Sequence, residues 1–493
     1  MREILNINKG WKFSKDVSSV PSKLPDDWQD IDLPYTWNGD DGQDGGNDYY
    51  RGKGYFAKIL TKDKMPQGEE IYIQLDGVNP TAEVYFNGKK LCEHNGGYSA
   101  FRVKLDDIKD ENLLVVTADN SPNAYVYPQV ADFTFYGGIY RDVKLIGVSK
   151  NHFDLDFFGS TSFAVTPVIS GNDAKITLDA YCNGEVEFEI DDGNEVVAKA
   201  KVSGKNPSAV LEIKDVHLWD GVDDPFLYNA SAKLIVDGQV ADEVKSRFGC
   251  RTFEIDAQKG FILNGRPYPL RGVSRHQDRP HIGNALLPEH HKEDMDLICE
   301  MGANTIRLAH YQHAQYFYDL CDERGIIVWA EIPYISKHLE KGVENTISQM
   351  KELIFQNYNH PSIVVWGLSN EISMGGATPA IVQNHKMLND LVHSIDKTSP
   401  TTEAVLTACN INEEYVHISD VLSYNHYFGW YGGDVSMYGD WFDNFHKKYP
   451  NKAIGMSEYG CEALNWHTSN PEQGDYTEEY QAYYHEEVIK QIA

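Results

Sequence analysis

Short runs of alternating hydrophobic and polar residues fill the chain up to about residue 148. In "EEIYIQLDGVNPTAEVYFNGKKL", Ile71, Ile73 and Leu75 would lie on one face of a strand, because successive side chains of a strand point to opposite faces. The pair Asn87-Gly88 in the same stretch is typical of a tight hairpin turn. We therefore expect residues 1–148 to form an all-β sandwich.

The same pattern recurs at smaller scale between residues 149 and 256. The strand-like runs are "KITLDAYC", "VEFEIDDGNEVVAKAKV" and "NASAKLIVDGQVADEVKSRFG", with turn signals at "DDGN" and "VDGQ". Short strands at regular spacing are typical of β-sandwiches. They predict a second domain, an immunoglobulin-like β-sandwich over residues 149–256.

From residue 257 onward, strand-like runs alternate with amphipathic helices such as "HKEDMDLICEMG" and "VENTISQMKELIFQNYN". The predicted strands are "YPLRGVSRH", "NTIRLAHY", "GIIVWAEIP", "SIVVWGLSNE", "EAVLTACN", "VLSYNHYFGW" and "AIGMSEYG". This alternation over residues 257–493 is typical of a (β/α)8 TIM barrel. "TEEYQAYYHEEVIKQIA" predicts a seventh helix, so we expect a barrel that is truncated before its eighth strand, since seven strands alone would leave two open edges.

Composition and charge narrow the class of protein. A net charge of −30 argues against nucleic acid as a partner, because its phosphates would be repelled. No run approaches about eighteen consecutive apolar residues, and "MREILNINKGWKF" lacks the apolar centre of a signal peptide, so we expect a cytoplasmic protein with no membrane partner. The seven scattered cysteines show no CxxC spacing and predict free thiols rather than a disulfide framework or a structural zinc site.

Two of the predicted barrel strands end in a glutamate, Glu371 in "GLSNE" and Glu458 in "GMSEYG". The strand ends of a barrel surround one mouth, so these side chains can face each other. Glycoside hydrolysis needs such a pair, one carboxylic acid to protonate the leaving oxygen and one carboxylate to attack the sugar, about 5 to 5.5 Å apart when configuration is retained. A lone glutamate here would more commonly be a helix cap or an ion-pair partner, but the pair predicts catalysis.

Other side chains at the strand ends could assist these glutamates. Arg307 could hold the charge of a neighbouring carboxylate, or form an ordinary barrel-mouth salt bridge. Tyr427 could donate a hydrogen bond to Glu458, or simply pack, and Asn370 could donate to a sugar hydroxyl. The candidate substrate-binding residues of the barrel are His276, Arg307, His310, Asn370, Asn425, Tyr427 and Trp430.

Histidines at the first two strand ends leave a metal site as an alternative. His276 and His310 could hydrogen-bond sugar hydroxyls, whereas His310 and His313 are spaced like two ligands of a zinc ion. No carboxylate or cysteine follows at ligand spacing, and the third strand ends in "AEIPYIS". We therefore expect no metal and no cofactor.

The motifs "RGVSRHQ", "IRLAHY", "GLSNE" and "SEYG", preceded by "DFTFYGGIYRDV", resemble glycoside hydrolase family two, the family of β-galactosidases and β-glucuronidases. The resemblance covers the whole chain. It implies a jelly-roll sugar-binding domain, an immunoglobulin-like sandwich and a catalytic barrel. It also implies a retaining mechanism with Glu371 as acid/base and Glu458 as nucleophile, and an Asp132 that reaches from the first domain to bind sugar hydroxyls.

The chain departs from parts of this pattern. The large magnesium-dependent β-galactosidases of the family carry a Glu-x-His pair after the third strand, where this chain has Ile335 and Ser336. Cys461 after "SEYG" replaces a histidine of some of those enzymes. The Asn-x-Lys pair with which β-glucuronidases hold the uronate carboxylate would follow the eighth strand, beyond residue 493.

Three functions therefore compete. A retaining exo-glycosidase acting on terminal β-D-galactosides is favoured, because "DFTFYGGIYRDV" is closer to the galactosidase form and the acidity of the chain disfavours an anionic substrate. A β-glucuronidase with the same mechanism is the alternative. A carbohydrate-binding protein without turnover is the alternative of another class. A homo-oligomer is compatible with each.

Overall fold

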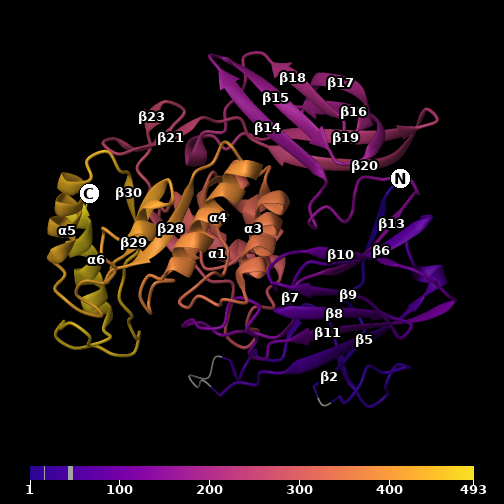
Figure 1. The fold of residues 1–493 in the computed structure, drawn as a ribbon, viewed down its shortest axis with the longest axis horizontal. Helices are drawn as coiled ribbons and strands as arrows, with labels where there is room; N and C mark the ends of the chain where they lie inside the picture. The colour runs from indigo at the N-terminus through magenta and orange to yellow at the C-terminus, as the bar shows by residue number, and fades with distance from the viewer. Residues whose placement is uncertain (16, 43–47, 493) are drawn as a thin grey trace. The chain divides into compact units, whose positions relative to one another are not determined.

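The computed structural model describes residues 1–15, 17–42 and 48–492 (Figure 1). The chain divides into two compact units. The first comprises Met1–Thr252, Arg271–Ile332 and Leu339–Val364, and the second comprises Phe253–Leu270, Pro333–His338 and Val365–Ala493. Each unit holds part of the predicted barrel.

A β-sandwich forms the N-terminal part of the first unit (Figure 1). One sheet has the order β1 (Glu3–Asn6), β13 (Val143–Val148), β6 (Glu70–Leu75) and β10 (Phe101–Leu105). The other has the order β3 (Gln29–Ile31), β2 (Trp11–Ser14), β5 (Lys53–Thr61), β11 (Glu111–Asp119), β8 (Thr81–Phe86) and β9 (Lys89–Asn95). Ile71, Ile73 and Leu75 are buried in its core, and Asn87 and Gly88 both have positive φ in the turn between β8 and β9. The predicted sandwich and hairpin are confirmed.

A small sheet and a short helical turn complete this domain. The sheet has the order β4 (Tyr35–Thr36), β12 (Gly138–Ile139) and β7 (Val78–Asn79), and the turn η1 spans Lys62–Lys64. Strand β12 lies within the stretch "DFTFYGGIYRDV" and pairs with β4 and β7. This pairing fixes the loop of residues 132–137 to the sandwich.

A second sandwich follows, as predicted. Its sheets have the orders β14 (Phe163–Ser170), β15 (Asp173–Ala180), β18 (Ser208–Ile213) and β17 (Val196–Lys205), β16 (Asn183–Asp191), β19 (Tyr228–Val236), β20 (Gln239–Phe248), with η2 at Gly221–Asp223. Alternate residues such as Val186, Phe188 and Ile190 are fully buried, which is the period of a strand with one face in a core.

The seven predicted barrel strands are present and follow the chain order in one parallel sheet. They are β24 (Gly272–Arg275), β25 (Thr305–Leu308), β26 (Ile327–Glu331), β27 (Ile363–Asn370), β28 (Thr401–Leu406), β29 (Val421–Asn425) and β30 (Ile454–Glu458). All eight residues of β27 are buried, as its continuous apolar run predicts. A small antiparallel sheet of β21 (Phe253–Asp256), β22 (Gly260–Leu263) and β23 (Arg266–Pro267) precedes the barrel.

Helices connect these strands. They are α1 (Pro288–Glu300), α2 (Gln315–Arg324), α3 (Val343–Asn357), α4 (Pro379–Ile395), α5 (Met437–Lys448) and α6 (Glu478–Ile492). Between β28 and β29 the described chain has only the 3-10 turn η3 (Glu414–His417), and α6 follows β30 as the seventh helical segment when η3 is counted. No helix among the described residues is long and apolar enough to cross a membrane.

Within the first unit, the N-terminal sandwich packs on the loops that follow β24 and β25. Tyr98 and Tyr311 stack with their ring centroids 4.3 Å apart, in a cluster with Tyr140. The Arg141 guanidinium donates to the backbone carbonyl oxygens of Tyr98 and Gln312 at 2.6 and 2.8 Å. These contacts hold the loop "DFTFYGGIYRDV" against two barrel strand ends.

Candidate active site

The end of β27 carries a register shift and an unusual backbone conformation. Gly367 pairs with Thr402 and Asn370 pairs with Ala404, so β27 has two residues between these pairs where β28 has one. Such a β-bulge re-aims the side chains that follow it. Glu371 then adopts φ 47°, a left-handed conformation that is uncommon outside glycine. Its backbone N–H donates to the carbonyl of Ala404 at 2.8 Å, which helps to hold this conformation.

Asn425 at the end of β29 joins the neighbouring strand ends. Its side-chain amide donates to Glu371 Oε1 at 2.9 Å and to Asn370 Oδ1 at 3.1 Å. The Ser457 hydroxyl donates to Asn425 Oδ1 at 2.7 Å, which fixes the orientation of the amide. Asn425 is buried and Glu371 is half-buried, so the amide orients the Glu371 carboxyl from the interior side.

Glu458 at the end of β30 has a different neighbour. The Tyr427 hydroxyl donates to Glu458 Oε2 at 2.7 Å, as the sequence suggested. Burial raises the pKa of Tyr427, and the nearby carboxylates of Glu458 and then Glu371 raise it further. The phenol therefore stays protonated at neutral pH and remains a donor to Glu458.

Trp430 lies close to this group but in an apolar environment. It is 9% exposed and belongs to a core cluster with Tyr438, Cys461 and Tyr484. Its ring centroid lies 4.9 Å from that of Tyr476. Burial raises the pKa of the Cys461 thiol to about 11, so this side chain is a neutral thiol in the cluster.

The first unit brings together Arg307, His310 and Glu331 at the ends of β25 and β26. Arg307 forms two hydrogen bonds with the Glu331 carboxylate, Nε to Oε2 and Nη2 to Oε1, both at 2.9 Å. His310 Nδ1 lies 2.7 Å from Glu331 Oε1. Burial by itself raises the pKa of Glu331, but the Arg307 charge and the His310 contact outweigh it and hold the pKa below its ordinary value. Glu331 therefore orients both side chains as a buried carboxylate.

His276 and the loop of the first domain meet beside this trio. The Phe133 ring centroid lies 5.0 Å from that of His276 and 5.9 Å from that of His310. His276 Nδ1 lies 3.2 Å from the Tyr311 hydroxyl, and burial lowers the pKa of His276 to about 3, so the imidazole is neutral. Asp132, directly before Phe133, is exposed. The loop thus reaches the ends of β24 and β25 within this unit.

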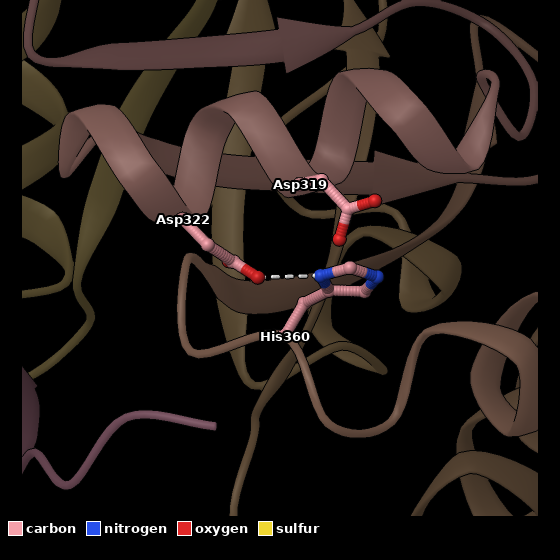
Figure 2. Close-up of side chains that lie close together, drawn as sticks. All are labelled: Asp319, Asp322 and His360. Atoms are coloured by element: carbon pink, nitrogen blue, oxygen red, sulfur yellow. Dashed lines mark hydrogen bonds and ion pairs between the residues drawn. The ribbon is translucent and has the colours of Figure 1, made fainter. Parts of the chain in front are cut away.

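Among the described residues, the side chains spaced closely enough to bind a metal ion are not the strand-end histidines. His313 is held separately from His310, with Nε2 3.0 Å from the carbonyl of Ala309. The group whose ligand atoms lie within 4.8 Å of one another is Asp319, Asp322 and His360, shown in Figure 2.

Charge compensation explains this cluster without an ion. His360 Nδ1 lies 2.6 Å from Asp322 Oδ2, and Arg247 forms a 3.2 Å ion pair with Asp319. Burial lowers the pKa of His360, but the Asp322 charge outweighs it and the net pKa is raised. The Asp322 carboxylate therefore favours the protonated form of His360, and we interpret the cluster as an ion-pair network.

Three family models match the chain in the order of its domains. "Glycosyl hydrolases family 2, sugar binding domain" matches residues 42–148, "Glycosyl hydrolases family 2" matches residues 161–251, and "Glycosyl hydrolases family 2, TIM barrel domain" matches residues 253–493. The chain belongs to glycosyl hydrolase family 2. The expected resemblance is confirmed over all three domains.

Known family 2 proteins resemble the chain along its whole length. A β-glucuronidase of Bacteroides fragilis is 39% identical over 99% of the chain and 73% of that protein. A crystal structure described as an FMN-binding β-glucuronidase from F. prausnitzii L2-6 has a TM-score of 0.95 at 41% identity, covering 100% of this chain and 77% of that one. Another, described as a putative β-galactosidase from Bacteroides fragilis, has a TM-score of 0.92 at 33% identity, with the same coverage of both chains.

Sequence reasoning about this family 2 chain missed Glu331. The third strand, "GIIVWAEIP", ends in a carboxylate just as the fourth and seventh do, and that position was the available signal. Arg307 meets this carboxylate in the first unit, while Asn425 and Tyr427 meet Glu371 and Glu458 in the second. Each unit thus has hydrogen-bonded polar side chains of its own at barrel strand ends.

Proposed function

We propose that the protein is a retaining exo-glycosidase of family 2 that hydrolyses β-D-glucuronides. The observation that carries the mechanism is the pair of strand-end glutamates in the second unit, each with its own buried or half-buried hydrogen-bond donor. Two carboxyl groups with different neighbours suit the two different roles that retaining hydrolysis needs.

Glu458 is assigned as the nucleophile and Glu371 as the acid/base. In the first step the Glu458 carboxylate attacks the anomeric carbon, the bond to the leaving oxygen breaks, and Glu371 gives its proton to that oxygen. In the second step Glu371 takes a proton from water, the water oxygen attacks the anomeric carbon, and the ester bond to Glu458 breaks. Both carboxyl groups return to their starting states.

The neighbouring side chains receive supporting roles. Tyr427 orients Glu458 through its 2.7 Å hydrogen bond, and Asn425 orients Glu371 through its 2.9 Å hydrogen bond. Among the remaining candidates, His276, His310 and Asn370 are assigned to sugar hydroxyls. Asp132 is assigned the same role, supported by the packing of its neighbour Phe133 on two barrel histidines. Trp430 supports the second unit through its apolar cluster.

A glucuronide is preferred to the galactoside that the sequence motifs favoured. The similar β-glucuronidases share 39% and 41% of their residues with the chain, against 33% for the putative β-galactosidase. The net charge of −30 does not oppose this substrate strongly, because local cations rather than total charge decide how one carboxylate is bound.

Parallel kinetics with the full-length protein test this proposal. We expect kcat/KM for 4-nitrophenyl β-D-glucuronide to exceed that for the β-D-galactoside by at least about a hundredfold, because a site built for a carboxylate leaves its charges unpaired with a neutral sugar. Proton NMR of the reaction should show the β-anomer of the released sugar first. A preference for the galactoside would restore the galactosidase hypothesis, and initial release of the α-anomer would exclude retention.

A carbohydrate-binding protein without turnover is the competing class. It predicts saturable glucuronide binding in calorimetry with no release of nitrophenol. Glu458→Gln distinguishes the two hypotheses, since it should remove turnover from an enzyme while leaving the fold unchanged.

A further inference from the structure

A buried polar contact lies behind the candidate acid/base, where β27, α4 and β28 meet. The Ser369 hydroxyl lies 2.7 Å from His385 Nε2, and Glu403 Oε2 lies 3.2 Å from the same nitrogen. Ser369 is 1% exposed, and His385 and Glu403 are fully buried. None of the three has a role in the hydrolysis steps above.

Hydrogen-bond geometry indicates that the His385 imidazole is neutral. His385 Nδ1 lies 2.9 Å from the carbonyl oxygen of Ile381, which can only accept, so Nδ1 carries the proton and Nε2 is the acceptor of a neutral ring. Burial lowers the pKa of His385 to about 4 and raises the pKa of Glu403 well above its ordinary value. The Ser369 hydroxyl therefore donates to Nε2 of a neutral imidazole, and the Glu403 carboxyl lies beside the same nitrogen.

This arrangement is not a nucleophilic triad. In a Ser-His-acid triad the hydroxyl and the carboxylate meet opposite ring nitrogens, so that the ring can pass a proton between them. Here both meet Nε2, and all three side chains are closed off from solvent. We therefore interpret the hydrogen bond between Ser369 and His385 as structural.

The position it holds is the bulge of β27. Ser369 lies inside the register shift between Gly367 and Asn370, where the ladder with β28 is interrupted. The next residues, Asn370 and Glu371, turn toward Asn425, and Glu371 adopts its left-handed conformation. Ser369 has no ladder partner on β28, so its side-chain hydrogen bond adds to the backbone hydrogen bonds of Asn370 and Glu371 that fix how the strand leaves the sheet.

We propose that Ser369, His385 and Glu403 are positioning residues that lock this bulge and thereby aim the Glu371 carboxyl at the glycosidic oxygen. The inference rests on the proposed role of Glu371 as acid/base. Breaking the contact between Ser369 and His385 lets the strand end shift. A displacement of about 1 Å at a reacting group can lower the rate on the order of a hundredfold. The cost should fall on proton donation to the leaving group.

Kinetics with two leaving groups test this in the full-length protein. Phenyl β-D-glucuronide needs protonation of its leaving oxygen, whereas 2,4-dinitrophenyl β-D-glucuronide needs little. We expect Ser369→Ala and Glu403→Leu to lower kcat/KM for the phenyl substrate by about ten- to a hundredfold, and for the dinitrophenyl substrate by less than about threefold. Glu403→Gln keeps the size and polarity of the group beside His385 and should stay within about threefold of wild type on both.

Thr401→Val is the matched control. Thr401 is also fully buried on β28, and its hydroxyl donates to Asn389 of α4 at 2.5 Å, so the variant breaks a polar contact between the same strand and helix away from the bulge. This variant should lower the melting temperature and change kcat/KM for the two substrates by the same factor.

The outcomes separate the two proposals. If Ser369→Ala lowers kcat/KM equally for both substrates, the positioning role is overturned and the proposed function stays intact. The same conclusion follows if Glu403→Gln is as impaired as Glu403→Leu. A wild-type protein that hydrolyses neither substrate would overturn both. If Glu403→Leu does not fold, Ser369→Ala and Glu403→Gln carry the test.

Discussion

Glu331 should be a major contributor to the stability of the first unit. Its side chain is fully buried, it forms two hydrogen bonds with Arg307, and Arg307 is itself only 5% exposed. Removing one partner of a buried ion pair costs about 3 to 5 kcal/mol, because the other charge is left in a poorly solvated site. Glu331→Gln keeps the shape but removes the charge, so we expect a loss near the lower figure.

Calorimetry checks this magnitude. A loss of about 3 kcal/mol should lower the melting temperature by roughly 6 to 12 °C, taking roughly 2 to 4 °C per kcal/mol for a barrel-sized domain. Glu323→Gln is the control, because Glu323 pairs with Arg247 at 2.5 Å but both side chains are more than a third exposed. An exposed pair of this kind contributes about 1 kcal/mol or less.

The pH dependence has a defined sign. The folded-state pKa of Glu331 is lowered from 4.5, so its contribution is fully present above about pH 4.5 and is lost as the pH falls through the lower folded value. The gap between wild type and Glu331→Gln should therefore be constant from pH 5 to 7 and narrow in acid. A variant no less stable than Glu323→Gln, or a gap that widens in acid, would refute the assignment.

The remaining predictions concern the proposed chemistry. Glu458→Gln should abolish turnover for every leaving group, because the covalent intermediate cannot form. Glu371→Ala should retain part of its activity on an activated phenol substrate and recover with azide, which attacks without a general base. Equal loss of nitrophenol release in both variants, with no rescue by azide, would contradict these roles. Asp132→Ala should lower kcat/KM by about ten- to a hundredfold, as expected for lost charge-assisted hydrogen bonds, with an unchanged melting temperature because Asp132 is exposed; unaltered steady-state kinetics would remove Asp132 from the site. Tyr427→Phe removes the 2.7 Å hydrogen bond to Glu458 and should lower kcat/KM by about tenfold or more with little effect on KM; a change confined to KM would assign Tyr427 to substrate binding instead.

Glu331 and Ser369 show why parts of the site could not be predicted. Glu331 lies in the apolar run "GIIVWAEIP", and nothing in that run shows that its partner is Arg307 on the neighbouring strand. Arg307 was expected either to hold the charge of a neighbouring carboxylate or to form an ordinary salt bridge, and its carboxylate partner in the first unit is Glu331, a choice that depends on strand register. Ser369 reads as an ordinary strand residue until the register shift in β27 is known. The domain boundaries at residues 148 and 256 stay predictions.

The sequence by itself determined the order and type of the domains. Alternating patterns fold as half-buried strands, and a continuous apolar run such as "SIVVWG" folds as a strand buried on both faces, because burial of apolar surface follows the period of each element. It also determined that Glu371 comes directly after one predicted strand and that Glu458 ends another. The tertiary structure decided between a hydrogen bond and simple packing for Tyr427, which donates to Glu458. It alone supplied the partners Asn425 for Glu371 and Glu331 for Arg307. Hydrogen bonds require agreement within a few tenths of an ångström, and that agreement depends on register and bulges that side-chain periodicity does not encode.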